Sequence, residues 1–368
     1  LWTQRSRINT YGVTPKYTLE HTIFDRDNKL ITGVDEYVAD YTSNKYDQSN
    51  DDDLKTHTRI RKTSVAGYLN DEFKVIDKLT LSGGYRLEQA AYLFNYHDAT
   101  GWNPDIHSQV HYDQWAAHTG LAYSCTDVST LYGDVSRSLR FPEVDEFTYN
   151  DGSWQQQLNT SLRPQAATTY QLGVRQKIND WAKADVSVYR MHLTDELYYN
   201  STGGPLAAGQ NQNYDKTVHE GLNLSLESEL TRRISMTGAY TYTHAYFHGG
   251  DYDKNQIPLV AHHKFSTGVK VSLPADMVWH VTGIYVGKRY TLNDQANSHG
   301  LINGYAVVNT SLTWQKKDWS VSAGINNLFN KQYAEYAGWA TNPATSAPDR
   351  FYYPSPERNY TVGMTRKF

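Results

Sequence analysis

The sequence predicts an all-β fold, specifically a transmembrane antiparallel up-and-down β-barrel. Three observations lead to this prediction. Apolar and polar residues alternate along almost the whole chain, and the connections between these alternating runs are short and long in turn. The aromatic residues are mostly tyrosine, with 30 Tyr against 10 Phe and 9 Trp. Rings that carry one polar end are typical of membrane–water interfaces and of binding surfaces.

Alternation with a period of two predicts strands whose two faces meet different surroundings. In the run 221–230, Leu222 and Leu224 fall on one face, and Ser225 and Glu227 fall on the other. A shift by one residue in the similar run around Lys270 would turn that lysine toward lipid. A lysine at the middle of a bilayer costs about 2–4 kcal/mol. The charged face is therefore expected to line the interior of the barrel.

We expect about fifteen strands, each close to the roughly 9–11 residues that a tilted strand needs to cross a bilayer. They are placed at residues 15–23, 29–38, 63–74, 78–89, 113–125, 128–137, 168–178, 182–193, 217–229, 234–246, 263–273, 277–290, 304–315, 318–327 and 357–368.

The connections between these strands alternate between short and long. The short ones are 24–28, 75–77, 126–127, 179–181, 231–233, 274–276 and 316–317, and the long ones are 39–62, 90–112, 138–167, 194–216, 247–262, 291–303 and 328–356. Outer-membrane barrels have short periplasmic turns and long extracellular loops. The last strand follows a long loop, so we expect it to end at the periplasm, at Phe368.

Composition argues against several other classes of protein. A single cysteine, Cys125, leaves no disulfide framework and no thiolate metal cage. No stretch approaches the roughly 18 apolar residues of a membrane helix, and Leu1–Arg5 does not read as a signal peptide. The mean hydropathy of -0.68 would by itself indicate a soluble protein. A porin-like barrel is nevertheless polar on average, because only every second strand residue faces lipid.

The sequence contains no recognisable active site. Ser, His and Asp are scattered, without a nucleophile elbow, a Gly-rich phosphate loop or a zinc-binding His pair on a helix. His107 and His111 stand four residues apart in an expected loop, where solvated histidines are commoner than a metal site. We therefore expect no enzymatic activity, no cofactor, no metal site and no nucleic-acid partner.

Several segments resemble the barrel of TonB-dependent receptors. Gly324–Tyr333 is similar to the family's xNLFdkxY element, which precedes the last extracellular loop. Tyr353–Tyr360, followed by alternation to a terminal aromatic residue, resembles the family's closing strand. Ser138–Glu146 resembles the gfRaPxxxEl stretch, and weaker matches follow the family's order between residues 60 and 368. Gln165 and Ala261 depart from the pattern, which usually has an acidic residue and a proline there.

This resemblance implies that the strands are the last fifteen or so of a barrel of about 22 strands. The family's barrels also enclose an N-terminal plug domain and carry an energy-coupling segment, and this chain contains neither. Residues 1–368 are therefore expected to form one domain, the C-terminal portion of a receptor barrel.

The resemblance further implies an active-transport receptor of the outer membrane. Such a receptor binds a scarce nutrient outside and imports it with energy from TonB, which contacts the absent N-terminal region. A ferric siderophore or another metal chelate is the expected ligand. Haem is disfavoured, since no histidine lies between Phe141 and Arg163, where haem receptors commonly carry one. The alternative is a passive porin of about sixteen strands, which the element at Gly324–Tyr333 disfavours.

The expected loops carry many aromatic residues, which give large contact areas at low entropic cost. Rings at strand ends are expected to anchor the barrel at the membrane surface, and rings within the loops to contact the ligand. The predicted ligand-binding residues are Tyr96, His97, Trp102, Tyr149, Trp154 and Tyr252.

The end of the chain is expected to direct assembly. Tyr360, Val362, Met364 and Phe368 fall on one face of the last strand, and the terminal aromatic residue resembles the signal read by the barrel-assembly machinery. An unpaired apolar edge is an aggregation hazard in water, so it must be captured and paired. Outer-membrane lipid and the assembly machinery are therefore expected partners.

Overall fold

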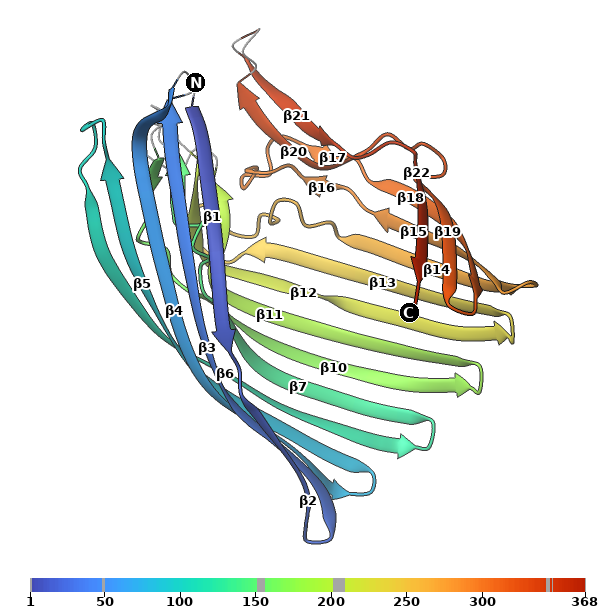
Figure 1. The fold of residues 1–368 in the computed structure, drawn as a ribbon. Helices are drawn as coiled ribbons and strands as arrows, with labels where there is room; N and C mark the ends of the chain where they lie inside the picture. The colour runs from blue at the N-terminus through green and yellow to red at the C-terminus, as the bar shows by residue number, and fades with distance from the viewer. Residues whose placement is uncertain are drawn as a thin grey trace. The chain divides into compact units, whose positions relative to one another are not determined.

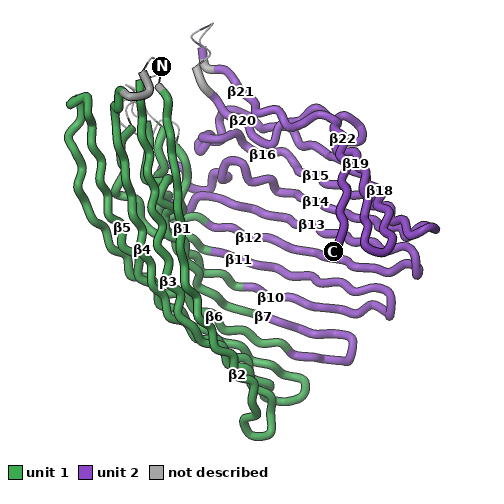
Figure 2. Tube along the Cα trace, in the orientation of Figure 1, with its two compact units in different colours: residues 1–122, 134–170, 192–217 green, residues 123–133, 171–191, 218–368 purple. Residues whose placement is uncertain are grey.

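The computed structural model describes residues 2–47, 50–150, 156–200, 209–341, 345 and 347–367. No helix in that part of the chain is long and apolar enough to cross a membrane. The chain forms two compact units (Figure 2). Unit 1 comprises residues 1–122, 134–170 and 192–217, and unit 2 comprises residues 123–133, 171–191 and 218–368.

The secondary structure of the described residues consists of strands joined by turns. The strands are β1 (Trp2–Val13), β2 (Lys16–Ile23), β3 (Arg26–Asp47), β4 (Asn50–Ile76), β5 (Leu79–Asp98), β6 (Ile106–Thr126), β7 (Ser129–Arg140), β8 (Thr148–Asn150), β9 (Gln156–Leu158), β10 (Gln165–Asn179), β11 (Ala182–Asn200), β12 (Gln210–Thr231), β13 (Ile234–Phe247), β14 (His263–Leu273), β15 (Met277–Val286), β16 (Arg289–Tyr290), β17 (Leu301–Ile302), β18 (Tyr305–Lys316), β19 (Trp319–Asn326), β20 (Ala334–Thr341), β21 (Pro348–Pro354) and β22 (Asn359–Arg366).

Most strands join one antiparallel sheet in sequence order (Figure 1). The order is β1-β3-β4-β5-β6-β7-β10-β11-β12-β13-β14-β15-β18-β19-β22. β1 pairs with the second half of β3 and β2 with its first half. Between them lies Pro15, which has no amide hydrogen to donate. The predicted all-β, antiparallel, up-and-down arrangement is confirmed. β2 corresponds to the first expected strand, whereas β1 was not predicted to be a strand.

Several strands are longer than predicted. The four strands β3 to β6 contain 22, 27, 20 and 21 residues, respectively. Most residues of the expected loops at 39–62 and 90–112 therefore belong to strands. β11 and β12 likewise extend through much of 194–216. The prediction of loops there is wrong because it ended each strand at the length that crosses a bilayer. Pairing of backbone groups continues into water wherever the neighbouring strand continues.

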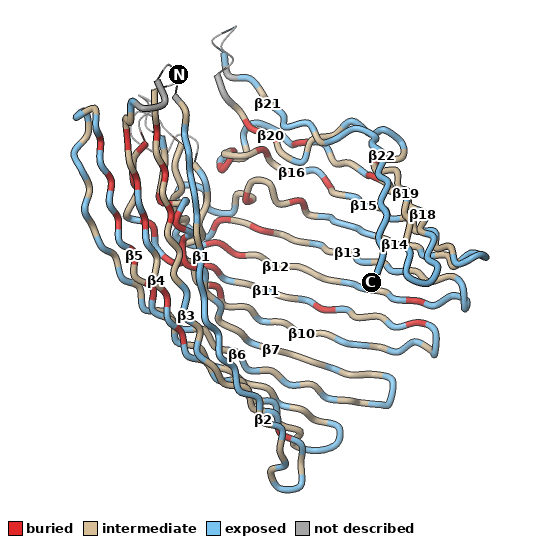
Figure 3. Tube along the Cα trace, viewed as in Figure 1, coloured by how far each residue is buried: buried red, intermediate tan, exposed pale blue. Residues whose placement is uncertain are grey.

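Alternation separates two faces within unit 1. Leu69, Leu87 and Leu121 are exposed on one face, which we call the outer face. On the opposite, inner face Arg86 pairs with Asp35 at 2.5 Å and with Glu88 at 2.8 Å. Buried residues gather along β3, β4 and β5 toward the long connections (Figure 3).

Unit 2 shows the same separation. Leu224 is 41% exposed on its outer face, whereas Glu227 pairs with Lys183 at 2.8 Å on the inner face. Lys270 is paired with Ser235 across the sheet, and Val269 with Met236. Glu227 and Lys183 therefore lie on the face opposite Leu224, as the alternation predicts. The outer face also carries charge where it is paired, since Arg190 lies 3.6 Å from Glu220 on the face of Val188.

β22 lies at the end of the strand order and pairs with β19. Its residues Tyr360, Val362 and Met364 are 70%, 84% and 66% exposed. They stand opposite Ile325, Ala323 and Val321 and so share one face of the strand. Phe368 lies outside the described residues.

Gly33 lies on the inner face of β3, where neighbouring atoms leave no room for a side chain. A Cβ added at Gly33 would stand 2.5 Å from the Tyr68 hydroxyl and 2.7 Å from the Pro15 carbonyl oxygen, whereas one at Gly67 would meet no atom within 4 Å. We expect Gly33→Ala to lower the free energy of unfolding by about 1–3 kcal/mol. Urea unfolding of the full-length protein in lipid measures this. Gly67→Ala is the matched control, and an equal effect of both variants would contradict the packing.

Candidate functional site

The connection between β7 and β10, residues 141–164, turns onto the inner face of unit 1, and we call it the inner loop. Phe141 is 5% exposed. The Tyr92 hydroxyl donates a 2.7 Å hydrogen bond to the Pro142 carbonyl. The Lys62 ammonium lies 5.6 Å from the ring centres of both Tyr92 and Phe141. The stretch Ser138–Glu146 thus contains the point at which the chain turns inward.

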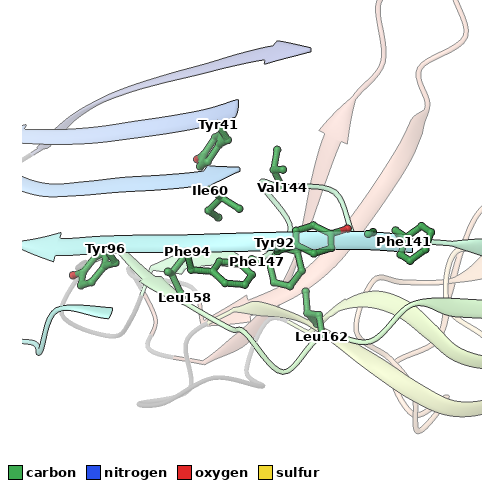
Figure 4. Close-up of a cluster of buried hydrophobic side chains, with 11 residues drawn as sticks. Tyr41, Ile60, Tyr92, Phe94, Tyr96, Phe141, Val144, Phe147, Leu158 and Leu162 are labelled. Carbon is green, nitrogen blue, oxygen red and sulfur yellow. The ribbon is translucent and has the colours of Figure 1, made fainter. Parts of the chain in front are cut away.

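A hydrophobic core holds the inner loop against the strands (Figure 4). Phe147 is fully buried, and its ring centre lies 4.9 Å from those of Tyr92 and Phe94. The inner wall of a membrane barrel is usually polar, so this core marks a place where the wall is built to hold a segment of chain. The core also includes Tyr41, Ile60, Ala90 and Tyr96 from the strands and Val144, Leu158 and Leu162 from the loop.

Polar contacts secure the far end of the inner loop. The Asn213 side chain accepts a 2.9 Å hydrogen bond from the Arg163 amide and donates one of 2.9 Å to the Arg163 carbonyl. Its amide group also donates to the Asp195 carbonyl at 2.7 Å. The Arg163 guanidinium pairs with the Asp195 carboxylate at 2.5 Å. The loop is therefore anchored where it leaves the strands and again where it returns.

The β8–β9 hairpin in the middle of the inner loop also contacts the wall. The buried Thr58 hydroxyl donates a 2.9 Å hydrogen bond to Gln156, and the buried Lys45 ammonium donates one of 2.5 Å to Asn150. Tyr149, next to Asn150 in β8, is paired with Gln157 and is partly exposed. An aromatic side chain is thereby presented from a supported backbone.

The turn between β5 and β6 is tied together by one carboxylate. Asp98 accepts hydrogen bonds from the amides of Thr100 and Asn103, at 2.9 and 2.8 Å. His97 lies on the other face of the strand and bonds Asp105 at 2.9 Å. Trp102, at the tip, is 70% exposed. The ring is thus displayed on an ordered turn.

The six predicted binding residues differ in exposure and in the element that carries them. Tyr96 is fully buried in the core under the inner loop, so its ring supports the loop and is not open to a ligand. His97 points to the outer face, Trp102 occupies the hairpin tip and Tyr149 lies on the inner loop. Tyr252 belongs to unit 2, is 40% exposed and packs against Phe247. Trp154 lies outside the described residues.

Sequence reasoning missed three residues that shape this site: Lys62, Phe147 and Asn213. It placed Tyr92 in an expected loop, whereas the residue is fully buried in β5. One signal was present, because Phe141, Val144 and Phe147 recur every third residue in the segment expected to be a long connection, residues 138–167. Among the described residues, no group of three His, Cys, Asp or Glu side chains could hold a metal ion.

A family model for the "TonB dependent receptor-like, beta-barrel" matches residues 2–328. The chain belongs to this family. The iron-regulated outer membrane virulence protein of Vibrio cholerae serotype O1 is 23% identical over 332 residues, which cover 83% of this chain and 46% of that protein. The predicted family and the outer-membrane location are thereby confirmed.

Solved receptors share the fold. The siderophore receptor PiuA from Acinetobacter baumannii aligns with a TM-score of 0.77 and 15% identity, over 99% of this chain and 56% of that one. The ferric-catecholate import receptor Fiu from E. coli K12 aligns with a TM-score of 0.74 and 17% identity, over 99% and 55%. The chain thus spans about half the length of these relatives.

The core predicts that Phe147 determines the position of the inner loop. Phe147→Ala removes a fully buried ring, which typically costs about 3–5 kcal/mol. We expect the loop to detach while the strands stay paired, because the backbone ladder does not involve this side chain. Limited proteolysis of the full-length protein should then cut within residues 141–164. Phe329→Ala, at a ring that is 74% exposed, is the control, and equal resistance of both variants would contradict the anchoring.

The β5–β6 turn lies in water beyond the membrane, and its hydrogen bonds predict that the stability of the turn depends on pH. Burial alone would raise the pKa of Asp98, but hydrogen bonds from Thr100 and Asn103 outweigh it and hold the pKa below its usual value. The stabilisation is therefore complete above the ordinary carboxyl pKa of about 4 and is lost as the pH falls through the lowered value. Hydrogen exchange of residues 98–105 should accelerate in that window. Asp98→Asn should abolish this change, and an unaltered profile would show that another group is responsible.

Proposed function

We propose that the protein is an outer-membrane receptor that binds a ferric siderophore, or another metal chelate, and imports it with energy delivered by TonB. The match to the TonB-dependent receptor barrel over residues 2–328 carries this proposal. Relatives named as iron-regulated and as catecholate siderophore receptors support the ligand class.

The anchoring of the inner loop supports a preformed binding surface. This surface lies at the ends of the strands from which the long connections emerge. The inner loop is anchored by a core and by amide hydrogen bonds, so little conformational entropy is lost when a ligand meets its exposed side. Preorganisation of this kind raises affinity by lowering the cost of ordering. Within unit 1, Tyr149 and Trp102 are the proposed ring contacts, with His97 near the hairpin tip.

In unit 2, Tyr252 is retained as a proposed contact on its position in a long connection. Tyr96 acts indirectly, as part of the core on which Tyr149 and its hairpin depend. Trp154 is retained as a proposed contact on its position in the sequence, between β8 and β9.

Transport by the full-length protein tests the proposal. In a strain that lacks its own ferric-siderophore receptors, expression should restore uptake of iron-55 from a ferric catecholate complex, and deletion of TonB should abolish it. Tyr149→Ala should weaken binding several-fold at unchanged surface expression. Entry that persists without TonB and rises linearly with solute concentration would identify a passive porin instead.

We also propose that the closing strand is recognised by the barrel-assembly machinery. The exposure of Tyr360, Val362 and Met364 on one face of β22 supports this, because such a face needs a partner before it meets water. Deleting Phe368 from the full-length protein should strongly lower its amount in the outer membrane. Normal accumulation with slightly lower heat stability would mean that the ring only anchors the strand.

A further inference from the structure

Arg137 stands on the outer face of unit 1, beside apolar side chains. In β6, Trp115 and Leu121 are 43% and 50% exposed on that face, and in β7 Val135 is 41% exposed. Arg137 follows Val135 by two residues, and its guanidinium carbon lies 4.2 Å from the centre of the Trp115 ring. The cost of a charge on a lipid face is greatest at the midplane and falls toward the interfaces. Arg137 therefore needs either an interfacial position or an opposite charge.

The neighbouring side chains place Arg137 at the edge of the apolar band. Along the outer face of β6, Leu121, Thr119, Ala117 and Trp115 are followed toward the long connection by Asp113 and His111. Tyr85 of β5 stacks on Trp115, with ring centres 6.1 Å apart and planes 23° apart. Paired rings of this kind occupy the headgroup level of a membrane. This edge faces the long connections, which lie outside the cell in barrels of this type.

The charge of Arg137 has no carboxylate partner among the described residues. Its guanidinium donates hydrogen bonds to the Trp115 carbonyl and to the Gln114 side chain. Two other arginines of the outer face, Arg59 and Arg61, share the carboxylate of Asp40 at 2.6 and 3.0 Å. Arg137 thus presents a positive charge at the level where phosphorylated headgroups lie.

We propose that Arg137, Trp115 and Tyr85 form a docking site for a phosphate group of lipopolysaccharide in the outer leaflet. The planar guanidinium matches phosphate oxygens in a paired geometry. The two rings contact the region between headgroup and acyl chains, and Leu121 and Val135 contact the chains. The site uses the outer face, so it is separate from the ligand surface on the inner loop. It depends on the outer-membrane location and is independent of transport.

Binding of purified lipopolysaccharide to delipidated full-length protein in detergent tests the proposal. Arg137→Gln should lower the affinity about fivefold, the effect of one basic residue at a lipid surface. Arg137→Lys keeps the charge and loses the planar geometry, so its affinity should be intermediate. The matched control is Arg175→Gln, because Arg175 also covers a ring, that of Tyr132 at 4.5 Å, but lies on the inner face of unit 2 with Asp185 as its partner. It should bind as the unaltered protein does.

Dephosphorylated lipopolysaccharide separates charge recognition from simple apolar contact. The unaltered protein should bind it about as weakly as Arg137→Gln binds the phosphorylated form, and the substitution should then have no further effect. Equal affinity of Arg137→Gln and the unaltered protein for the phosphorylated lipid would overturn the proposal. The proposal would also be overturned if the protein bound phosphatidylglycerol more tightly than lipopolysaccharide and this binding depended on Arg137. The site would then belong to a phospholipid. Heat-modifiable gel mobility verifies folding. If Arg137→Gln fails to fold, Arg137→Lys and the dephosphorylated lipid supply the same comparison.

Discussion

The pairing of backbone amides and carbonyls between neighbouring strands is the constraint on which this protein depends. Hydrocarbon offers no water to satisfy these groups, so a chain that crosses it in strands must hydrogen-bond each strand to the next. The antiparallel ladder from β1 to β22 meets that need. The alternation of side chains then follows from the pleat, because successive residues point to opposite faces. Leu224 can meet lipid while Glu227, three residues later, pairs with Lys183.

The same ladder explains why the strands continue beyond the apolar band. β4 and β5 pair from Ile76 and Leu79 as far as Thr56 and Asp98. Once two long strands are paired, each further residue adds backbone hydrogen bonds at a small cost in entropy. The extension provides a wall above the membrane. Side chains on that wall do not contact lipid. Apolar residues such as Tyr92 and Phe94 can therefore face inward and pack against the inner loop.

The inner loop and the arginine on the outer face show how one sheet serves two environments. On one face a core around Phe147 turns a long connection into an anchored surface. On the other face Trp115 and Arg137 lie where apolar residues give way to polar ones. Both features depend on side chains from strands that are neighbours in the sheet, and neither interrupts the backbone ladder.

The sequence by itself determined the fold class, the family and the two faces of most strands, because period-two alternation and short turns are local properties. Strand lengths and the inner loop were decided by tertiary structure. Tyr96 and His97 illustrate the difference. Alternation already places them on opposite faces, but only the structure shows that Tyr96 is covered and His97 is not. The cover comes from a segment about 50 residues away. The recurrence of Phe141, Val144 and Phe147 does not show which strand that segment contacts, as Phe147 contacts Tyr92. Such contacts depend on where two distant segments meet in space.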